Sequence, residues 1–115
     1  MLDYALVVFA VGALGGVMLA TYVLRGQLAP WLLSLLHAGL GAIGLLLLIY
    51  AALTSGISHM ALAALAILVI AALGGFYLAS IHLRGKVAQK PVVFIHAAVA
   101  VVGFLTLLAV VFEAL

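Results

Sequence analysis

The chain has 115 residues, of which 71% are hydrophobic and only 5% are charged. About a quarter of the residues of a soluble domain are charged, so this composition excludes an ordinary soluble protein and indicates lipid as the solvent. The net charge of +2 comes without a basic cluster, which excludes nucleic acid as a partner. The absence of cysteine excludes disulfides and thiolate metal sites.

Four apolar segments follow one another, and we predict membrane spans over residues 4–24, 30–53, 60–83 and 91–113. A segment of about 20 residues matches a hydrocarbon core of about 30 Å at 1.5 Å per helical residue. Helices are expected because a span must satisfy its own backbone hydrogen bonds in lipid. The alternation typical of a barrel strand is absent. We therefore predict one all-α domain, residues 1–115, folded as an up-down four-helix membrane bundle.

The basic residues predict the orientation of the bundle. Arg25 lies between the first two spans, and Arg84, Lys86 and Lys90 lie between the last two. Both loops fall on the same side, and the positive-inside rule makes that side cytoplasmic. The expected location is the bacterial inner (cytoplasmic) membrane, with several crossings and both termini outside.

An internal repeat relates the two halves of the chain. Between residues 13 and 48, 15 of 36 positions are identical to the residue found 59 positions later. The matching pairs include Arg25-Gly26 with Arg84-Gly85, His37 with His96, Gly15-Gly16 with Gly74-Gly75, and Gly44 with Gly103. Arginine and histidine are rare here, so their recurrence indicates tandem duplication of a helical hairpin, with copies at 1–59 and 60–115. Such copies are expected to be related by a pseudo-two-fold axis along the membrane normal.

Two histidines are the main candidates for a functional role. His37 lies seven residues past Pro30, and His96 lies five residues past Pro91, which places both about 10 Å inside the membrane at 1.5 Å per residue. Histidine within a span is costly and suggests a function. The second and fourth helices of an up-down bundle lie diagonally across the core, where two facing imidazoles can supply both axial ligands of haem iron. Zinc is less favoured, because it usually needs four ligands.

Small and basic residues around this pair fit the same hypothesis. Gly41 and Gly44 share the helical face of the first histidine, Gly103 shares that of the second, and all are expected to make room for a flat cofactor. Arg25 and Arg84 lie at the membrane boundary above the pair, where paired cations could bind the haem propionates. The alternative is that glycines merely permit close helix packing and arginines merely anchor the boundary.

The other two histidines are less informative. His82 lies two residues before Arg84, and Val23 occupies its place in the first copy. It could bond a propionate, deliver a proton or ligate a second site, or it could simply be an interfacial histidine. His59 lies in the turn between the second and third spans and is expected to be solvated.

Four apolar helices with paired core histidines and nearby glycines resemble the bacterial four-helix membrane b-type cytochromes. The resemblance covers the whole chain architecturally and rests on His37, His96, the glycines and the two arginines. It implies an electron-transfer protein that holds haem b and exchanges electrons with quinone or a partner subunit. Many members hold two haems on four histidines, but only His37 and His96 form a pair here, so we expect one haem per chain, toward the cytoplasmic side. The alternative, from a different class, is a cofactor-free structural or accessory subunit whose histidines join helices.

Overall fold

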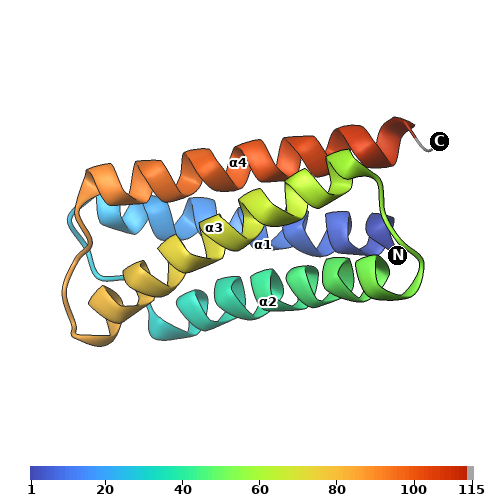
Figure 1. Ribbon diagram of the computed structural model, residues 1–115. Helices are drawn as coiled ribbons and strands as arrows, with labels where there is room; N and C mark the ends of the chain where they lie inside the picture. The colour runs from blue at the N-terminus through green and yellow to red at the C-terminus, as the bar shows by residue number, and fades with distance from the viewer. Residues whose placement is uncertain (114–115) are drawn as a thin grey trace.

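The protein is an all-α four-helix bundle in the computed structural model, which describes residues 1–113 (Figure 1). The helices are α1 (Leu2–Leu24), α2 (Trp31–Thr54), α3 (His59–Leu83) and α4 (Lys90–Glu113). The predicted spans are confirmed, with ends that differ by one or two residues. His59 and Lys90, which the sequence assigned to connecting segments, are the first residues of α3 and α4.

Short connections join successive helices, and each contains one glycine with a positive φ. Gly26 follows α1 with φ of 70°, and Gly85 follows α3 with φ of 72°. In both places the glycine N–H donates to a carbonyl three residues back, and the next N–H donates to a carbonyl five residues back. This is the Schellman arrangement, which favours glycine because other residues are strained at positive φ. The Arg-Gly sequence that occurs in both copies therefore ends a helix in each of them, in addition to placing one positive charge there.

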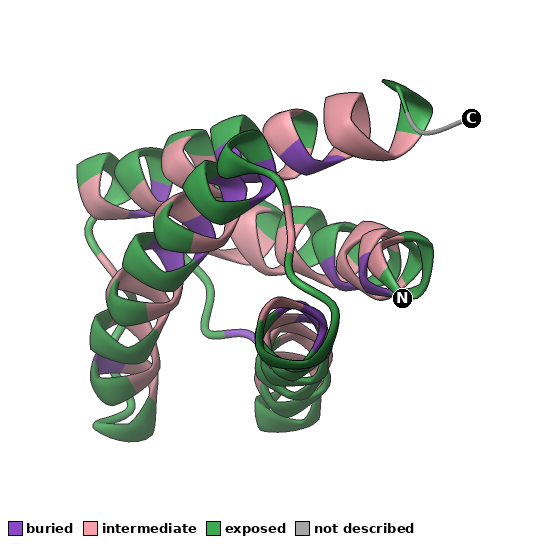
Figure 2. Cartoon of the chain, turned by 45° about the vertical axis from the view of Figure 1, so that its right-hand side comes forward, coloured by how far each residue is buried: buried purple, intermediate pink, exposed green. Residues whose placement is uncertain are grey.

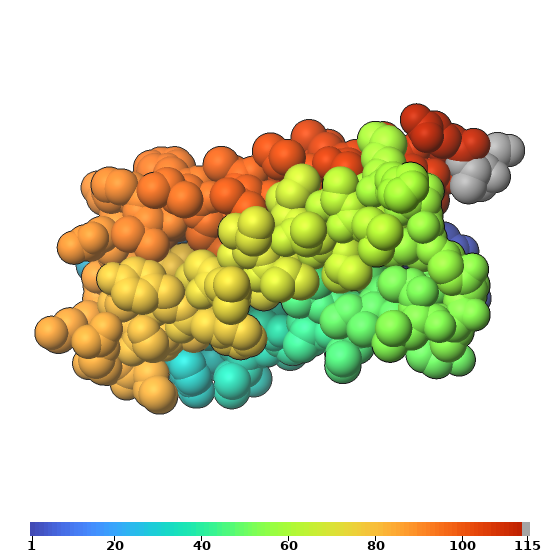
Figure 3. Space-filling view, in the orientation of Figure 1, coloured from blue at the N-terminus to red at the C-terminus, as the bar shows by residue number. Residues whose placement is uncertain are grey.

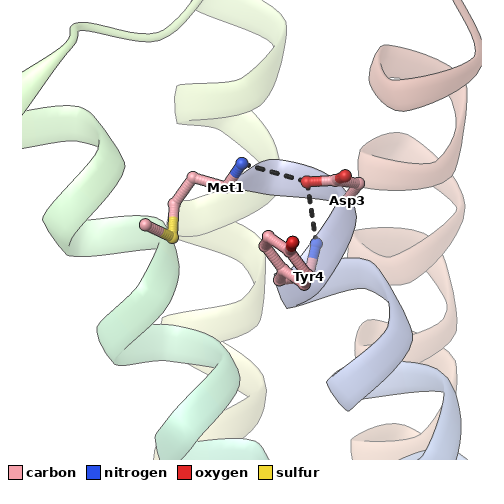
Figure 4. Close-up of polar contacts among 3 residues, drawn as sticks. All are labelled: Met1, Asp3 and Tyr4. Atoms are coloured by element: carbon pink, nitrogen blue, oxygen red, sulfur yellow. Dashed lines mark hydrogen bonds and ion pairs between the residues drawn. The ribbon is translucent and has the colours of Figure 1, made fainter.

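The two ends of the bundle differ in charge and polarity. The arginine end carries the connections 25–30 and 84–89, and the terminal end carries residues 55–58, the start of α1 and the end of α4 (Figure 1). At the terminal end, Oδ1 of Asp3 accepts hydrogen bonds from the amino group of Met1 and from the backbone N–H of Tyr4 (Figure 4). Ser58 caps α3 by accepting a hydrogen bond from the N–H of Ala61, which satisfies a free donor of the first turn.

Neighbouring helices pack around a square, with α1 against α2 and α4, and α3 against α4 and α2. The diagonal pairs α1–α3 and α2–α4 make no close backbone contact. Packing is most extensive within the two hairpins, α1–α2 and α3–α4, and less extensive between them. In Figures 1 and 3, α3 crosses the near face, from α4 at the terminal end to α2 at the arginine end.

The surface of the bundle is apolar on every side. Large hydrophobic side chains such as Leu14, Leu53, Leu83 and Phe76 are well exposed, and no polar or charged side chain within residues 1–113 is buried. Buried positions are few (Figure 2), and all of them except Ala29, in the connection before α2, lie on helices. The molecule is 42 Å long, close to the thickness of a bilayer with its headgroups. All four helices are long and apolar enough to cross a membrane, so the chain is a multi-pass membrane protein.

The tightest packing lies in the terminal half of the bundle. Its buried cluster consists of Ala5, Leu48, Ala64, Leu68 and Leu107, which come from all four helices. Two of these pairs, Ala5 with Ala64 and Leu48 with Leu107, are separated by 59 residues, the offset of the sequence repeat. The equivalent cluster is missing from the arginine half of the described chain, where the predicted site lies.

Candidate functional site

His37 is held against α1 by a hydrogen bond. Its Nδ1 lies 2.8 Å from the backbone carbonyl oxygen of Gly12. Because a carbonyl can only accept, Nδ1 carries the proton in the neutral ring and Nε2 keeps its lone pair. Metal-bound histidines usually have this arrangement, since the second ring nitrogen donates to a carbonyl or a carboxylate. His37 is therefore prepared to act as an Nε2 ligand.

His96 occupies the equivalent place on α4 but lacks the equivalent bond. Its Nδ1 is buried and has no hydrogen-bond partner. Ala71 lies 59 residues after Gly12, at the equivalent place on α3. Its backbone carbonyl lies near the imidazole of His96 but does not form a hydrogen bond with Nδ1. A buried donor without a partner is unfavourable, so this atom requires an explanation.

The two imidazoles lie close to each other in a T-shaped arrangement, although they come from diagonal helices. Their ring centroids are 6.3 Å apart, and their planes lie at 88°. Both residues are partly buried, although α2 and α4 make no close backbone contact. The fold therefore brings the predicted pair together from diagonal helices.

Glycines on α1 and α3 leave the space that the two imidazole rings occupy. A Cβ atom built on Gly16 would lie 2.9 Å from Cε1 of His37, and one built on Gly75 would lie 3.2 Å from Cε1 of His96. Both distances are shorter than ordinary van der Waals contact. The repeated glycine pairs thus make room for the imidazoles themselves.

The three glycines predicted to border a cofactor lie in different surroundings. A Cβ on Gly44 would clash with the ring of Phe9 at 2.6 Å, and one on Gly103 would clash with Leu68 at 2.8 Å. Both positions are buried and filled by those side chains. Gly41 has no atom within 4 Å of the position that its Cβ would take, so it alone of the three borders open space.

The arginines and the remaining histidines are separate from the pair. Arg25 and Arg84 are exposed residues that end α1 and α3, and Nε of Arg84 donates to the carbonyl of Ser80. Neither forms an ion pair within the part of the chain that the structure describes. His59 is exposed at the opposite, terminal end.

His82 joins α3 to the start of α2. Its Nε2 donates to the carbonyl of Ala29 at 2.8 Å, and its Nδ1 lies 2.6 Å from the hydroxyl of Ser34. The ring of Trp31 lies edge-on, with the centroids 4.7 Å apart. Both ring nitrogens are occupied by protein groups, so His82 has no nitrogen available for a ligand in this arrangement.

The sequence did not point to two of these contacts. The carbonyl of Gly12 could not be recognised as an acceptor, because every residue carries a carbonyl. The role of Ser34 had a usable signal, since it is the only hydroxyl-bearing residue between residues 30 and 49 and lies one turn before His37.

Two hollows lie near these residues. One, of about 290 Å³, lies at the arginine end and is lined by Leu28, Ala29, Trp31, His82, Leu83 and Gly85. The other, of about 310 Å³, lies between α3 and α4 and is lined by Ile70, Ala71, Gly74, Val92, Ile95, His96 and Val99. Ile70 and Ile95 are largely exposed, so the second hollow opens onto the lipid-facing surface.

The donor set fits a group held by two imidazoles. No cluster of three or more histidine or carboxylate ligands occurs within residues 1–113, which argues against a site built from protein ligands alone. Two imidazoles that share one metal have ring centroids about 6 Å apart, given metal–nitrogen bonds of about 2.0–2.1 Å. The observed 6.3 Å matches this separation. Helix packing between the two hairpins is less extensive than packing within them.

Comparison of the chain with protein-family models, with curated proteins and with solved structures gives no match.

Proposed function

We propose that this chain is a membrane electron-transfer protein that holds one haem b between α2 and α4, with His37 and His96 as its axial ligands. The observation that carries the proposal is the bond from Nδ1 of His37 to the carbonyl of Gly12, combined with the 6.3 Å separation of the rings. The bond leaves the lone pair of Nε2 free to bind a metal, and the distance between the ring centroids suits two imidazoles that share one metal.

A bound haem would supply one-electron redox chemistry. The protein's part is to hold two neutral imidazoles in fixed positions and to exclude water. The apolar helices around the pair support this role, because burying a charged group in a low-dielectric environment is unfavourable, whereas a neutral ligand can be buried there. Arg25 and Arg84 would attract anionic propionates electrostatically from the arginine end, where both are exposed.

The position of the pair suggests where electrons would pass. His37 lies in the second turn of α2, and His96 lies in the second turn of α4, so both are near the arginine end. We place that end on the cytoplasmic side of a bacterial inner membrane, because all four basic residues lie there. A single centre near one face suits transfer to quinone or to a partner subunit at that face.

The absorption spectrum of the purified protein tests the proposal. Protein made in haem-replete cells should be red and have an intense Soret band that shifts on reduction with dithionite. His37→Ala and His96→Ala should each remove the low-spin spectrum, because each removes one axial ligand.

Two matched histidine variants provide controls. His59→Ala should keep the spectrum because the residue is exposed at the terminal end, and His82→Ala should keep it because that ring contacts only α2 and the preceding loop. A colourless wild-type protein would instead support a cofactor-free structural subunit. Loss of the spectrum in all four variants would show that histidine removal disturbs folding in general.

A further inference from the structure

The two repeat-related histidines differ in a single contact. Nδ1 of His37 is bonded to the carbonyl of Gly12 at 2.8 Å. Nδ1 of His96 is buried without a partner, although the carbonyl of Ala71 lies at the equivalent place on α3. The pair is therefore chemically inequivalent despite its origin in one repeated sequence.

The residue that offers the carbonyl explains this difference. A Cβ atom on Gly12 would lie 3.3 Å from Cβ of Leu40, which is tighter than an ordinary contact. Glycine at position 12 thus permits the approach of α2 that closes the hydrogen bond. Ala71 carries a methyl group at the same point of α3. His96 also lies farther than His37 from its glycine, at 3.2 Å rather than 2.9 Å from the built Cβ positions.

The hollow of about 310 Å³ lies beside His96. Nδ1 of His96 lies 3.5 Å from the Cβ position of Gly74, which also lines the hollow. His96 is thus one of the residues that line the hollow, and the other lining residues are apolar. In the first hairpin, leucines stand at the positions equivalent to Val92, Ile95 and Val99, namely Leu33, Leu36 and Leu40.

We propose that His37 is the permanent ligand of the pair, that His96 is the exchangeable ligand, and that Gly12 and Ala71 are the positioning residues that set this difference. The ligand assignment rests on the haem function proposed above. An imidazole whose second N–H is bonded to a carbonyl is fixed in orientation and tautomer and is a better donor. His96 lacks that bond and borders a hollow into which its ring can turn, so a small neutral ligand can replace it.

The first experiment needs no haem. Nitrogen-15 spectra of the imidazoles, recorded in detergent micelles at a pH where the rings are neutral, report which nitrogen carries the proton. His37 should show the Nδ1–H tautomer alone, and His96 should show a mixture of tautomers. Ala71→Gly should convert His96 to the Nδ1–H tautomer, because it recreates the environment of Gly12.

The matched control for this experiment is Ala64→Gly, which makes the same change at another buried position of α3. It should leave the spectrum of His96 unchanged. The inequivalence is overturned if His96 of the wild-type protein already shows the Nδ1–H tautomer alone, or if Ala71→Gly has no effect on it.

The second experiment uses the haem-loaded protein. His37→Ala should weaken haem binding about 10- to 100-fold more than His96→Ala, in line with the usual effect of outer hydrogen bonds on metal affinity. Carbon monoxide, used as the probe ligand, should change the spectrum of the reduced wild-type protein and bind more weakly to Ala71→Gly. Equal haem loss in both alanine variants overturns the exchangeable-ligand assignment and leaves the haem function intact. A wild-type protein that binds no haem overturns the haem function, and the nitrogen-15 result then decides the inequivalence by itself.

Discussion

His82 of α3 and Ser34 of α2 are joined by a hydrogen bond of 2.6 Å between the imidazole Nδ1 and the serine hydroxyl. Nε2 of the same ring donates to the carbonyl of Ala29, so one side chain connects the second hairpin to the first at two points. The equivalent positions of the other interface, between α1 and α4, carry Val23 and Val93. One of two repeat-related interfaces is thus polar where the other is apolar.

This contact predicts coupled stability effects. His82→Val and Ser34→Val should each lower the free energy of unfolding by about 1–3 kcal/mol, because each leaves a polar group without its partner. The double variant recreates the valine pair of the other interface and should lose less than the sum of the two. Unfolding by sodium dodecyl sulfate in mixed micelles, followed by circular dichroism, measures all three. Strict additivity would show that the hydrogen bond makes no net contribution.

The glycine beside His37 predicts a loss of both stability and ligand geometry. Gly16→Ala places a Cβ atom 2.9 Å from Cε1 of the ring, so the imidazole must move away from α1. Overpacking of this kind costs about 1–3 kcal/mol, and the bond to the Gly12 carbonyl should break. The same unfolding assay checks the first effect, and the Soret band of the haem-loaded protein checks the second.

Gly39→Ala is the matched control for that substitution. Nothing lies within 4 Å of the position that its Cβ would take, and alanine favours helix by up to about 1 kcal/mol relative to glycine. The control should therefore be neutral or slightly stabilising. If both variants behave alike, steric contact with the imidazole is not the cause.

The contact between Gly44 and Phe9, in the terminal half of the bundle, predicts how substitutions at these two positions affect stability together. Gly44→Ala puts a methyl group 2.6 Å from the ring of Phe9 and should cost about 1–3 kcal/mol by overpacking. In the second copy, Leu68 stands at the place equivalent to Phe9 and packs on Gly103. A Cβ atom on Gly103 would also clash with Leu68, at 2.8 Å, so leucine at position 9 would not relieve the contact. Phe9→Ala removes the ring, and the double variant should therefore lose less stability in the unfolding assay than the sum of the two single variants. A double variant as unstable as that sum would contradict the contact.

The orientation of the chain can be tested on a background free of cysteine. We expect Ser55→Cys to react with a membrane-impermeant maleimide in spheroplasts, because residue 55 lies at the terminal end, outside the cell in our proposal. Gln27→Cys and Gln89→Cys should react only after lysis, since both lie at the arginine end. All three side chains are exposed, so reactivity reports sidedness. The reverse labelling pattern would invert the topology.

The spans, the short connections and the equal depth of His37 and His96 could be predicted from the sequence alone. Length and hydropathy decide the spans, because a lipid-embedded chain must form helices of nearly fixed length. The offset of 59 residues placed the two histidines at equal depth on diagonal helices, whereas their 6.3 Å separation depends on how the helices pack. The spans, the connections and the equal depth depend on the order of residues along the chain and on bilayer thickness.

Which side chain fills each space between the helices depends on the packing of the helices against one another. Gly44 and Gly103 look like the glycines beside the histidines, yet Phe9 and Leu68 fill the space they leave. The bonds of His82 to Ser34 and Ala29, and the unpaired Nδ1 of His96, likewise depend on how closely two helices approach. That approach is set within a few tenths of an ångström by contacts such as the one between Gly12 and Leu40, and no repeat or spacing in the sequence specifies it.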